Sequence, residues 1–258
     1  MSHRRIIGWY AALSTAIVLI AAPAAAQQSC ETLSGLRLPH TTITLAKAVS
    51  AGQFTPSSSD APAHPFDVPA FCEVEGVITP TPDSDIKFAV WMPATGWNGR
   101  FQQLGNAGYA GVIQYPLLVL ELRRGYATAS TDDGHTGTGD PTWAFHHPEK
   151  VIDFGYRAVH LTAENAKAIV QAFYGRPAER SYFAGCSDGG REALMEAQRF
   201  PGDFDGIMAG EPSNFATHLF AGFVWNEQAT LDNRASTVPA NKLPLIEAGA
   251  LATCAFPL

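Results

Sequence analysis

The sequence predicts an α/β protein with a mostly parallel sheet and flanking helices. From residue 71 onward, segments that alternate apolar and polar residues are interleaved with segments of helical spacing, as crossover connections between parallel strands require. The 258 residues are 46% apolar and 16% charged. That composition is typical of a folded domain with one sizeable core and excludes a disordered chain.

The beginning of the chain has the pattern of an export signal. Arg4 and Arg5 precede an apolar run over residues 6–20, and small residues lead up to Ala26. We expect residues 1–26 to be a signal peptide and the mature protein to be periplasmic or secreted, with no membrane contact after cleavage. The alternative, a membrane anchor, would need a longer apolar run.

The charge balance excludes one class of partner. The formal net charge of the chain is -7, from 17 basic and 24 acidic residues. Removal of Arg4 and Arg5 with the leader leaves 15 basic against 24 acidic residues, or -9. There is no basic stripe, so we expect no nucleic-acid partner.

The first part of the mature chain is strand-like. Residues 33–49 alternate in the β manner, and Thr55–Pro65 is a polar loop rich in proline and serine. The segments 71–79 and 86–93 both alternate and predict a β-hairpin or meander. We interpret the loop as a surface insertion, because strand-like sequence lies on both of its sides.

The remaining elements follow in strand–helix alternation. Short strands are expected near the glycine-rich turn at Gly105, over 126–130, over 181–184 and in "DGIMAGEPS". The segment 154–174 has helical spacing, with Gly175 as its stop. A second helix, "GREALMEAQRF", ends at Pro201-Gly202.

One motif between a strand and a helix carries chemistry. Residues 185–189 read Gly-Cys-Ser-Asp-Gly, a G-x-S-x-G sequence. With a strand before it and a helix after it, this is the arrangement of a nucleophile elbow, which predicts that Ser187 is a catalytic nucleophile. Larger side chains at Gly185 and Gly189 would collide with neighbouring backbone. The alternative is a purely structural glycine turn.

A nucleophile of this kind needs two backbone donors for an oxyanion. One is expected from Asp188, directly after the serine. The other is expected from "LGNAGYAG", residues 104–111, with Gly108 as first choice and Ala107 and Tyr109 as alternatives. An ordinary glycine turn is the competing interpretation of this loop.

The sequence supplies no clear base for Ser187. In the usual order of this catalytic arrangement the acid and the histidine follow the serine, and only His218 does so here. Asp203 and Asp205 are expected at the sheet edge opposite the elbow, as loop residues. Four histidines precede the serine and are candidates only if the fold brings them near it, and they break the order: His135, His146, His147 and His160. Either the base is unconventional or the chain is incomplete.

Two long segments carry a family resemblance. "HHPEKVIDFGYRAVHLTAENAKAIVQAFYG" and "SYFAGCSDGGREALMEAQRFPGDFDGIMAGEPS" closely resemble the tannase/feruloyl esterase family, which includes the mono(hydroxyethyl) terephthalate hydrolases. The resemblance runs from about Cys30 to Cys254. It implies an α/β-hydrolase core with an inserted lid, and hydrolysis of small aromatic esters such as hydroxycinnamates and gallates. It also assigns the nucleophile to Ser187.

The resemblance also assigns the four cysteines of the mature chain. In an exported protein cysteines should pair, and their wide spacing makes a zinc site improbable. By resemblance, Cys30 and Cys72 form an N-terminal disulfide, and Cys186 pairs with a cysteine directly after the catalytic histidine. No His-Cys dipeptide occurs in this sequence. Cys186 and Cys254 are therefore expected to lack their partners, with a bond between the two only as a rescue.

These departures predict an incomplete chain. The resemblance places the acid, the histidine and a calcium-binding loop downstream, whereas this sequence departs from it after Cys254. We expect residues 27–258 to be the N-terminal part of the catalytic domain, truncated before the lid and the C-terminal part of the core. The lid would begin at about 235–258, and this chain would hold no cofactor.

Three functions follow as hypotheses. The first is an exported serine carboxylesterase whose present fragment is poorly active, because loss of a base removes several orders of magnitude of rate. The second is a non-catalytic exported binding remnant. The third is a complete hydrolase of another type that uses an upstream histidine such as His135.

Overall fold

The computed structural model describes residues 27–56, 64–137 and 139–254. The expected signal peptide and part of the polar loop lie outside these residues. The strands are β1 (Thr41–Val49), β2 (Gly52–Phe54), β3 (Phe66–Val68), β4 (Phe71–Ile78), β5 (Ile86–Pro93), β6 (Arg100–Leu104), β7 (Ala127–Thr131), β8 (Arg180–Cys186) and β9 (Gly206–Gly210). The α-helices are α1 (Tyr115–Arg123), α2 (Pro148–Ile152), α3 (Ala158–Tyr174), α4 (Asp188–Arg199), α5 (Ala216–Leu231) and α6 (Leu243–Cys254).

Several shorter helical turns join these elements. They are η1 (Cys30–Gly35), η2 (Pro141–Ala144), the π-helical turn η3 (Asp153–Arg157), η4 (Arg234–Ser236) and η5 (Ala240–Lys242). The helix expected over 154–174 is therefore a π-helical turn continued by α3. Gly175 ends it with φ 67° in the left-handed region, as a helix-terminating glycine does.

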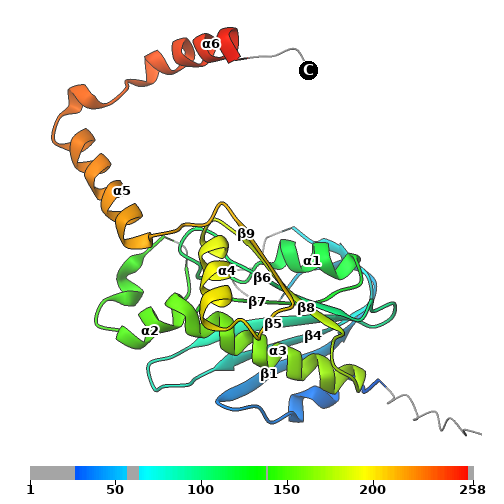
Figure 1. Ribbon diagram of the computed structural model, residues 1–258. Helices are drawn as coiled ribbons and strands as arrows, with labels where there is room; N and C mark the ends of the chain where they lie inside the picture. The colour runs from blue at the N-terminus through cyan, green and yellow to red at the C-terminus, as the bar shows by residue number, and fades with distance from the viewer. Residues whose placement is uncertain (1–26, 57–63, 138, 255–258) are drawn as a thin grey trace, which may run out of the picture.

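The main sheet has the strand order β1-β4-β5-β7-β6-β8-β9 (Figure 1). β1, β4, β5 and β7 pair antiparallel, which confirms the hairpin expected over 71–93. β7, β6, β8 and β9 pair parallel, and their connections run through α1, α3 and α4. This parallel half carries the serine motif, and the whole confirms the α/β fold class.

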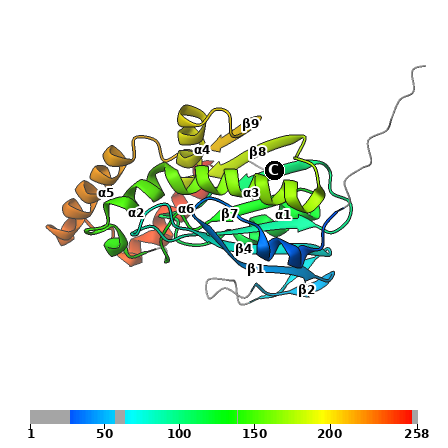
Figure 2. The same cartoon turned by 90° about the horizontal axis from the view of Figure 1, so that it is seen from below.

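A core lies on each face of the sheet, because successive strand residues point to opposite faces. On β5, Phe88 and Val90 pack into the core beneath α3, whereas Ala89 and Trp91 pack into the core beneath α1. Figure 2 shows α3 lying along the sheet. The helices α3 and α4 therefore cover one face of the sheet and α1 covers the other.

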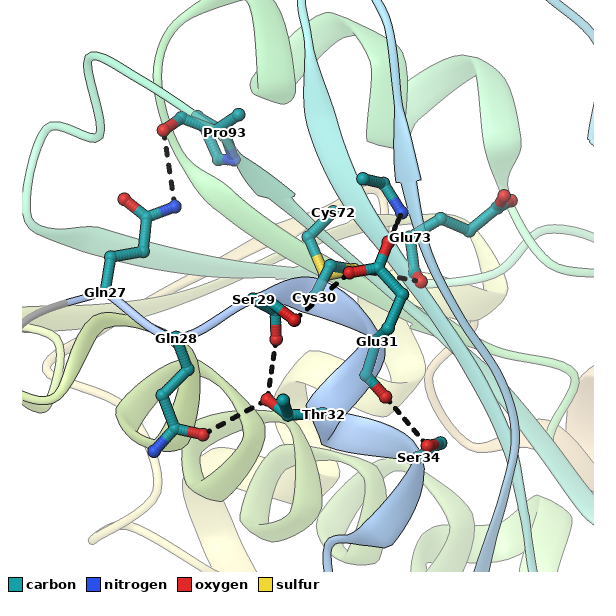
Figure 3. The surroundings of a disulfide bond; sticks show 12 residues. Gln27, Gln28, Ser29, Cys30, Glu31, Thr32, Ser34, Cys72, Glu73 and Pro93 are labelled. Atoms are coloured by element: carbon teal, nitrogen blue, oxygen red, sulfur yellow. Dashed lines mark hydrogen bonds between the residues drawn. A yellow bond between two sulfur atoms is a disulfide. The ribbon is translucent and has the colours of Figure 1, made fainter.

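The Cys30–Cys72 disulfide fastens the N-terminal segment to this core (Figure 3). Both cysteines are buried, with a Cα–Cα distance of 5.5 Å. Glu31, on the same turn η1, accepts a hydrogen bond of 3.1 Å from the amide of Ala48 in β1. The predicted N-terminal disulfide is confirmed.

The last two helices stand apart from the sheet. Figure 1 shows α5 and α6 leading away from it, and α5 has no buried residue. Phe220 of α5 stacks its ring on that of Tyr109, in the loop after β6, at 5.3 Å. In the described part of the chain, no helix has the length and apolar character needed to cross a bilayer.

Candidate active site

Ser187 occupies the sharp turn between β8 and α4. Its backbone has φ 62° and ψ −114°, a conformation that non-glycine residues rarely adopt. The side chain is exposed at the carboxyl end of the parallel strands. This is the geometry of a nucleophile elbow, in which the strained turn presents the serine hydroxyl to solvent or substrate.

The flanking glycines allow the elbow to pack. A Cβ added to Gly185 would lie 2.3 Å from the carbonyl oxygen of Gly189, and one added to Gly189 would lie 2.8 Å from that of Asn106. Gly105 faces them from the loop after β6, where an added Cβ would lie 2.8 Å from the Gly189 Cα. The collisions predicted from sequence are therefore real, and they involve the candidate oxyanion loop itself.

β9 supports the elbow from the other side. The Ser187 amide donates to the Gly210 carbonyl at 3.0 Å, and the Ser213 amide donates to the Ser187 carbonyl at 3.0 Å. A Cβ on Gly190 would lie 2.4 Å from the Gly210 oxygen. Backbone contacts on both sides fix the strained conformation of Ser187, as a conformation of that energy requires.

The two predicted sources of oxyanion donors lie on either side of one hydrogen bond. The Gly189 amide donates to the Asn106 carbonyl at 2.8 Å and so joins the first turn of α4 to the loop after β6. The amides of Asp188, Ala107, Gly108 and Tyr109 have no acceptor among the described residues. Gly108 has φ 64°. Its selection over its two neighbours stays a prediction.

The side chain of Asp188 forms an ion pair with Arg191. Arg191 contacts both carboxylate oxygens of Asp188, at 2.6 and 3.1 Å, and both side chains are largely buried. Arg191 also donates to the carbonyls of Phe154 and Gly155, at 3.2 Å each, and covers the Phe154 ring at 4.2 Å. This network fixes the start of α4.

A second pair of acids is completely buried next to this network. Asp133 follows β7 and Glu192 lies on α4, and Glu192 Oε2 accepts the Asn106 amide at 3.1 Å. Burial, reinforced by the charge of Glu192, raises the pKa of Asp133 well above its ordinary value. Burial likewise raises the pKa of Glu192. Asp133 was not singled out from the sequence, and Glu192 was missed as well. Its position four residues after Asp188, on the same helical face, was the available signal.

The histidines do not meet the serine. No described residue makes a hydrogen bond to the Ser187 hydroxyl. His218 is exposed on α5. His135 is buried against Trp143, with ring centroids 3.9 Å apart, and burial lowers its pKa. His160 binds Asp203 at 2.6 Å.

The other acids and histidines are also engaged elsewhere. His147 binds Asp83 at 2.6 Å, and His146 is exposed. Asp205 accepts the Ser181 amide at the start of β8, which is the end opposite Ser187. The prediction that Asp203 and Asp205 lie away from the elbow is confirmed.

The remaining cysteines are partly described. Cys186 is exposed and carries a free thiol, with its Sγ beside Gly210. The side chain of Cys254 lies outside the described part of the structure. The disulfide partner assigned to Cys186 by resemblance stays a prediction.

Neither cluster of potential metal ligands among the described residues suits calcium. The group His160, Glu196 and Asp203 contains an imidazole, and Lys167 lies 3.7 Å from Asp203. In the second group, Asp133, Asp188 and Glu192, the Asp188 oxygens are already bonded to an arginine. Calcium prefers six to eight oxygen ligands without a competing cation.

Comparison with known proteins gives this site a context. An uncharacterized esterase from Xanthomonas campestris pv. campestris is 47% identical over 241 residues, which are 93% of this chain and 41% of that protein. A probable feruloyl esterase B-2 from Aspergillus terreus is 39% identical over 147 residues, which are 56% of this chain and 27% of that protein. The chain thus spans less than half the length of these relatives.

Solved structures agree on the fold. Feruloyl esterase B from Aspergillus oryzae has a TM-score of 0.67 at 33% identity, over 72% of this chain and 37% of that one. Tannin acyl hydrolase from Aspergillus niger has a TM-score of 0.63 at 24% identity, over 89% and 46%. The family described as tannase and feruloyl esterase matches residues 72–256. A match that begins in β4 and runs through the elbow shows that the chain belongs to the tannase and feruloyl esterase family.

Proposed function

We propose that the protein is an exported serine esterase that cleaves carboxylic esters of small aromatic compounds. The observation that carries the proposal is Ser187 itself: exposed, strained to φ 62° and followed by an amide that has no acceptor among the described residues. The probable feruloyl esterase among the relatives supports the ester class. The buried disulfide and the leader-like start of the sequence support export.

The chemistry assigned to the described residues is acyl transfer. The Ser187 Oγ attacks the ester carbonyl, and its proton passes to a general base. The carbonyl oxygen becomes an oxyanion that accepts hydrogen bonds from the Asp188 amide and from one amide of residues 107–109. Collapse releases the alcohol and leaves an acyl-serine, which water then hydrolyses.

The base and its orienting acid are not among the described residues that contact Ser187. By family resemblance they belong to a downstream segment, with the histidine next to a cysteine that bonds Cys186. We therefore expect the 258-residue chain alone to hydrolyse esters slowly, because loss of a triad base costs about 10³-fold or more in rate.

An aromatic slot beside the oxyanion loop supports the substrate class. This slot is a cavity of about 180 Å³ lined by Tyr109, Asp140 and Trp143. A larger cavity of about 290 Å³ lies at Tyr182, away from the oxyanion loop. Tyr109 directly follows Gly108, so a flat ring in the smaller cavity would lie close to the proposed oxyanion donors.

The test uses prolonged incubation with a fluorophosphonate, which modifies an activated serine rapidly and a serine without its base slowly, together with methyl ferulate and methyl butyrate as substrates. Ser187→Ala should abolish modification and any hydrolysis. The matched control Ser213→Ala removes a nearby hydroxyl and should leave both unchanged. Trp143→Ala should raise KM for methyl ferulate several-fold more than for methyl butyrate. Equal modification of Ser187→Ala and the parent chain would show that Ser187 is not the nucleophile.

A further inference from the structure

Three buried carboxylate oxygens near the elbow lack a conventional donor. Both oxygens of Asp133 and Oε1 of Glu192 receive no N–H or O–H from the described residues. One oxygen each from Asp133, Asp188 and Glu192 lies within 4.8 Å of the others. Buried carboxylates without donors are strongly destabilising, so this group requires an explanation.

The nearest cation does not neutralise this pair directly. Arg191 uses its guanidinium on both oxygens of Asp188 and on the carbonyls of Phe154 and Gly155. Two adjacent ionised carboxylates in a fully buried site repel each other, and one of them retains its proton. A proton between Asp133 and Glu192 gives an O–H···O hydrogen bond, which engages two of these three oxygens, one as donor and one as acceptor. The raised pKa of each carboxyl agrees with this state.

The pair lies at the junction of both halves of the oxyanion site. The second oxygen of Glu192 accepts the Asn106 amide at 3.1 Å. The Asn106 carbonyl accepts the Gly189 amide at 2.8 Å, and the Asn106 side chain donates to the Thr131 carbonyl at 2.9 Å. Asn106 directly precedes the loop amides at 107–109, and Gly189 directly follows the Asp188 amide.

We propose that a proton shared by Asp133 and Glu192 positions the oxyanion loop against the nucleophile helix. Neither residue touches substrate in this role; both are positioning residues that act through Asn106. The inference rests on the proposed function, because it assigns the oxyanion site to the amides on either side of this junction.

The pH dependence follows from the groups that face the pair. Asp188 and Arg191 face it from α4, and Glu196 lies one turn further along the same helix. When the shared proton is lost at alkaline pH, Asp133 and Glu192 both become anions with only the already paired Arg191 nearby. Their repulsion should loosen the Glu192–Asn106 bond and displace the loop.

The experiment compares two substitutions at one position. Asp133→Asn keeps an N–H donor for Glu192 but cannot ionise. We expect it to keep the rate of Ser187 modification by fluorophosphonate within about threefold of the parent at pH 7, and to remove the alkaline decline. Asp133→Ala has no donor and should slow modification by about ten- to hundredfold, since one oxyanion donor is worth about 10² or more.

A second readout does not depend on catalysis. The readout is hydrogen exchange of the Asn106 amide, corrected for the intrinsic rate at each pH. Exchange should be faster in Asp133→Ala than in the parent. It should also become faster in the parent at a pH above the titration of the pair, but not in Asp133→Asn. Glu196→Gln is the matched control: it lies on the same helix and is equally buried, yet it is bonded to neither Asn106 nor Asp133. It should change neither readout.

The outcomes separate the two proposals. No modification of Ser187 in the parent chain even after prolonged incubation would overturn the proposed function, while the exchange data would still test the carboxyl pair. Asp133→Asn behaving like Asp133→Ala would overturn the shared proton, as would a pH profile identical in the parent and the Asn variant. One equivalent of tightly bound metal, lost on Glu192→Gln, would also overturn it.

Discussion

The Gly189 amide and the Asn106 carbonyl are joined by a 2.8 Å hydrogen bond that crosses from the nucleophile helix to the loop after β6. This bond fixes the position of Ser187 relative to the candidate oxyanion loop. A change that separates the two residues should weaken reactivity without removing any reacting group.

Gly189→Ala is expected to separate them. The new Cβ would meet the Asn106 carbonyl oxygen at 2.8 Å, so the loop or the helix must move. We expect a loss of about 1 to 3 kcal/mol in the free energy of unfolding, typical of overpacking. Urea denaturation measures the stability, and fluorophosphonate modification of Ser187 should slow as well. Gly202→Ala is the control, because a Cβ there meets nothing within 4 Å. Native stability of Gly189→Ala would contradict the close packing described here.

Arg191→Ala is expected to be severely destabilising. It leaves the buried Asp188 carboxylate without its partner and removes two bonds to backbone carbonyls. Breaking a buried ion pair on one side costs about 3–5 kcal/mol. Arg199→Ala on the same helix removes an exposed guanidinium that covers Tyr156, and it should cost less than about 1 kcal/mol. Similar unfolding midpoints for the two variants would show that the Asp188–Arg191 ion pair does not contribute the expected stability.

Loss of the Cys30–Cys72 disulfide should lower the free energy of unfolding without changing the geometry of the Ser187 site. Replacing Cys30 and Cys72 by serine opens a link across 42 residues. We expect a loss of about 3–4 kcal/mol in the free energy of unfolding. A reductant should lower the stability of the parent chain to a similar degree and leave the double variant unchanged. Cys186→Ser, at the exposed free thiol, should leave the unfolding free energy nearly unaltered.

Glu73 should make the protein less stable as the pH rises. Burial, followed by the charge of Glu75, raises its pKa to about 7. The folded state therefore holds a proton that the unfolded state releases near pH 4.5, and this stabilisation is present below that pH and is lost as the pH rises toward 7. Relative to Glu73→Gln, the parent should lose about 1 to 3 kcal/mol between pH 5 and 8.

Glu31→Gln is the control, because the pKa of Glu31 is shifted in the opposite direction to that of Glu73. Hydrogen bonds from its own amide and that of Ala48 lower the pKa of Glu31. Its stabilising contribution is present above the ordinary pKa and is lost only on acidification. The substitution should therefore leave the slope between pH 5 and 8 unchanged. A parent curve parallel to that of Glu73→Gln over this range would show that Glu73 is already ionised.

The elbow could be predicted because its determinants are local. Five consecutive residues, 185–189, require a strand before them and a helix after them, and periodicity reveals both. The hairpin of β4 and β5 was predictable for the same reason. The Cys30–Cys72 bond was predicted from family resemblance rather than from spacing.

The Asp133–Glu192 pair could not be predicted in this way. Its two members are 59 positions apart in the sequence, and they meet beside the loop after β6, the strand that lies between β7 and β8 in the sheet. Periodicity places a residue on a face of its own element, but it does not state which strand lies beside which. Asn106 was missed as an organising residue for the same reason, since two of its four hydrogen bonds go to α4, one goes to β7 and one to Gln114 at the start of α1.

The contact between Ser187 and β9 has a consequence for the order of folding. The amide and the carbonyl of Ser187 are bonded to Gly210 and Ser213, which are made more than twenty residues later. Parallel strands joined by a crossover pair slowly, because the intervening chain must first be ordered. During synthesis the serine therefore leaves the ribosome well before its elbow can close. A released chain that ends before residue 210 should hold a relaxed Ser187 that is less reactive than in the chain that includes β9.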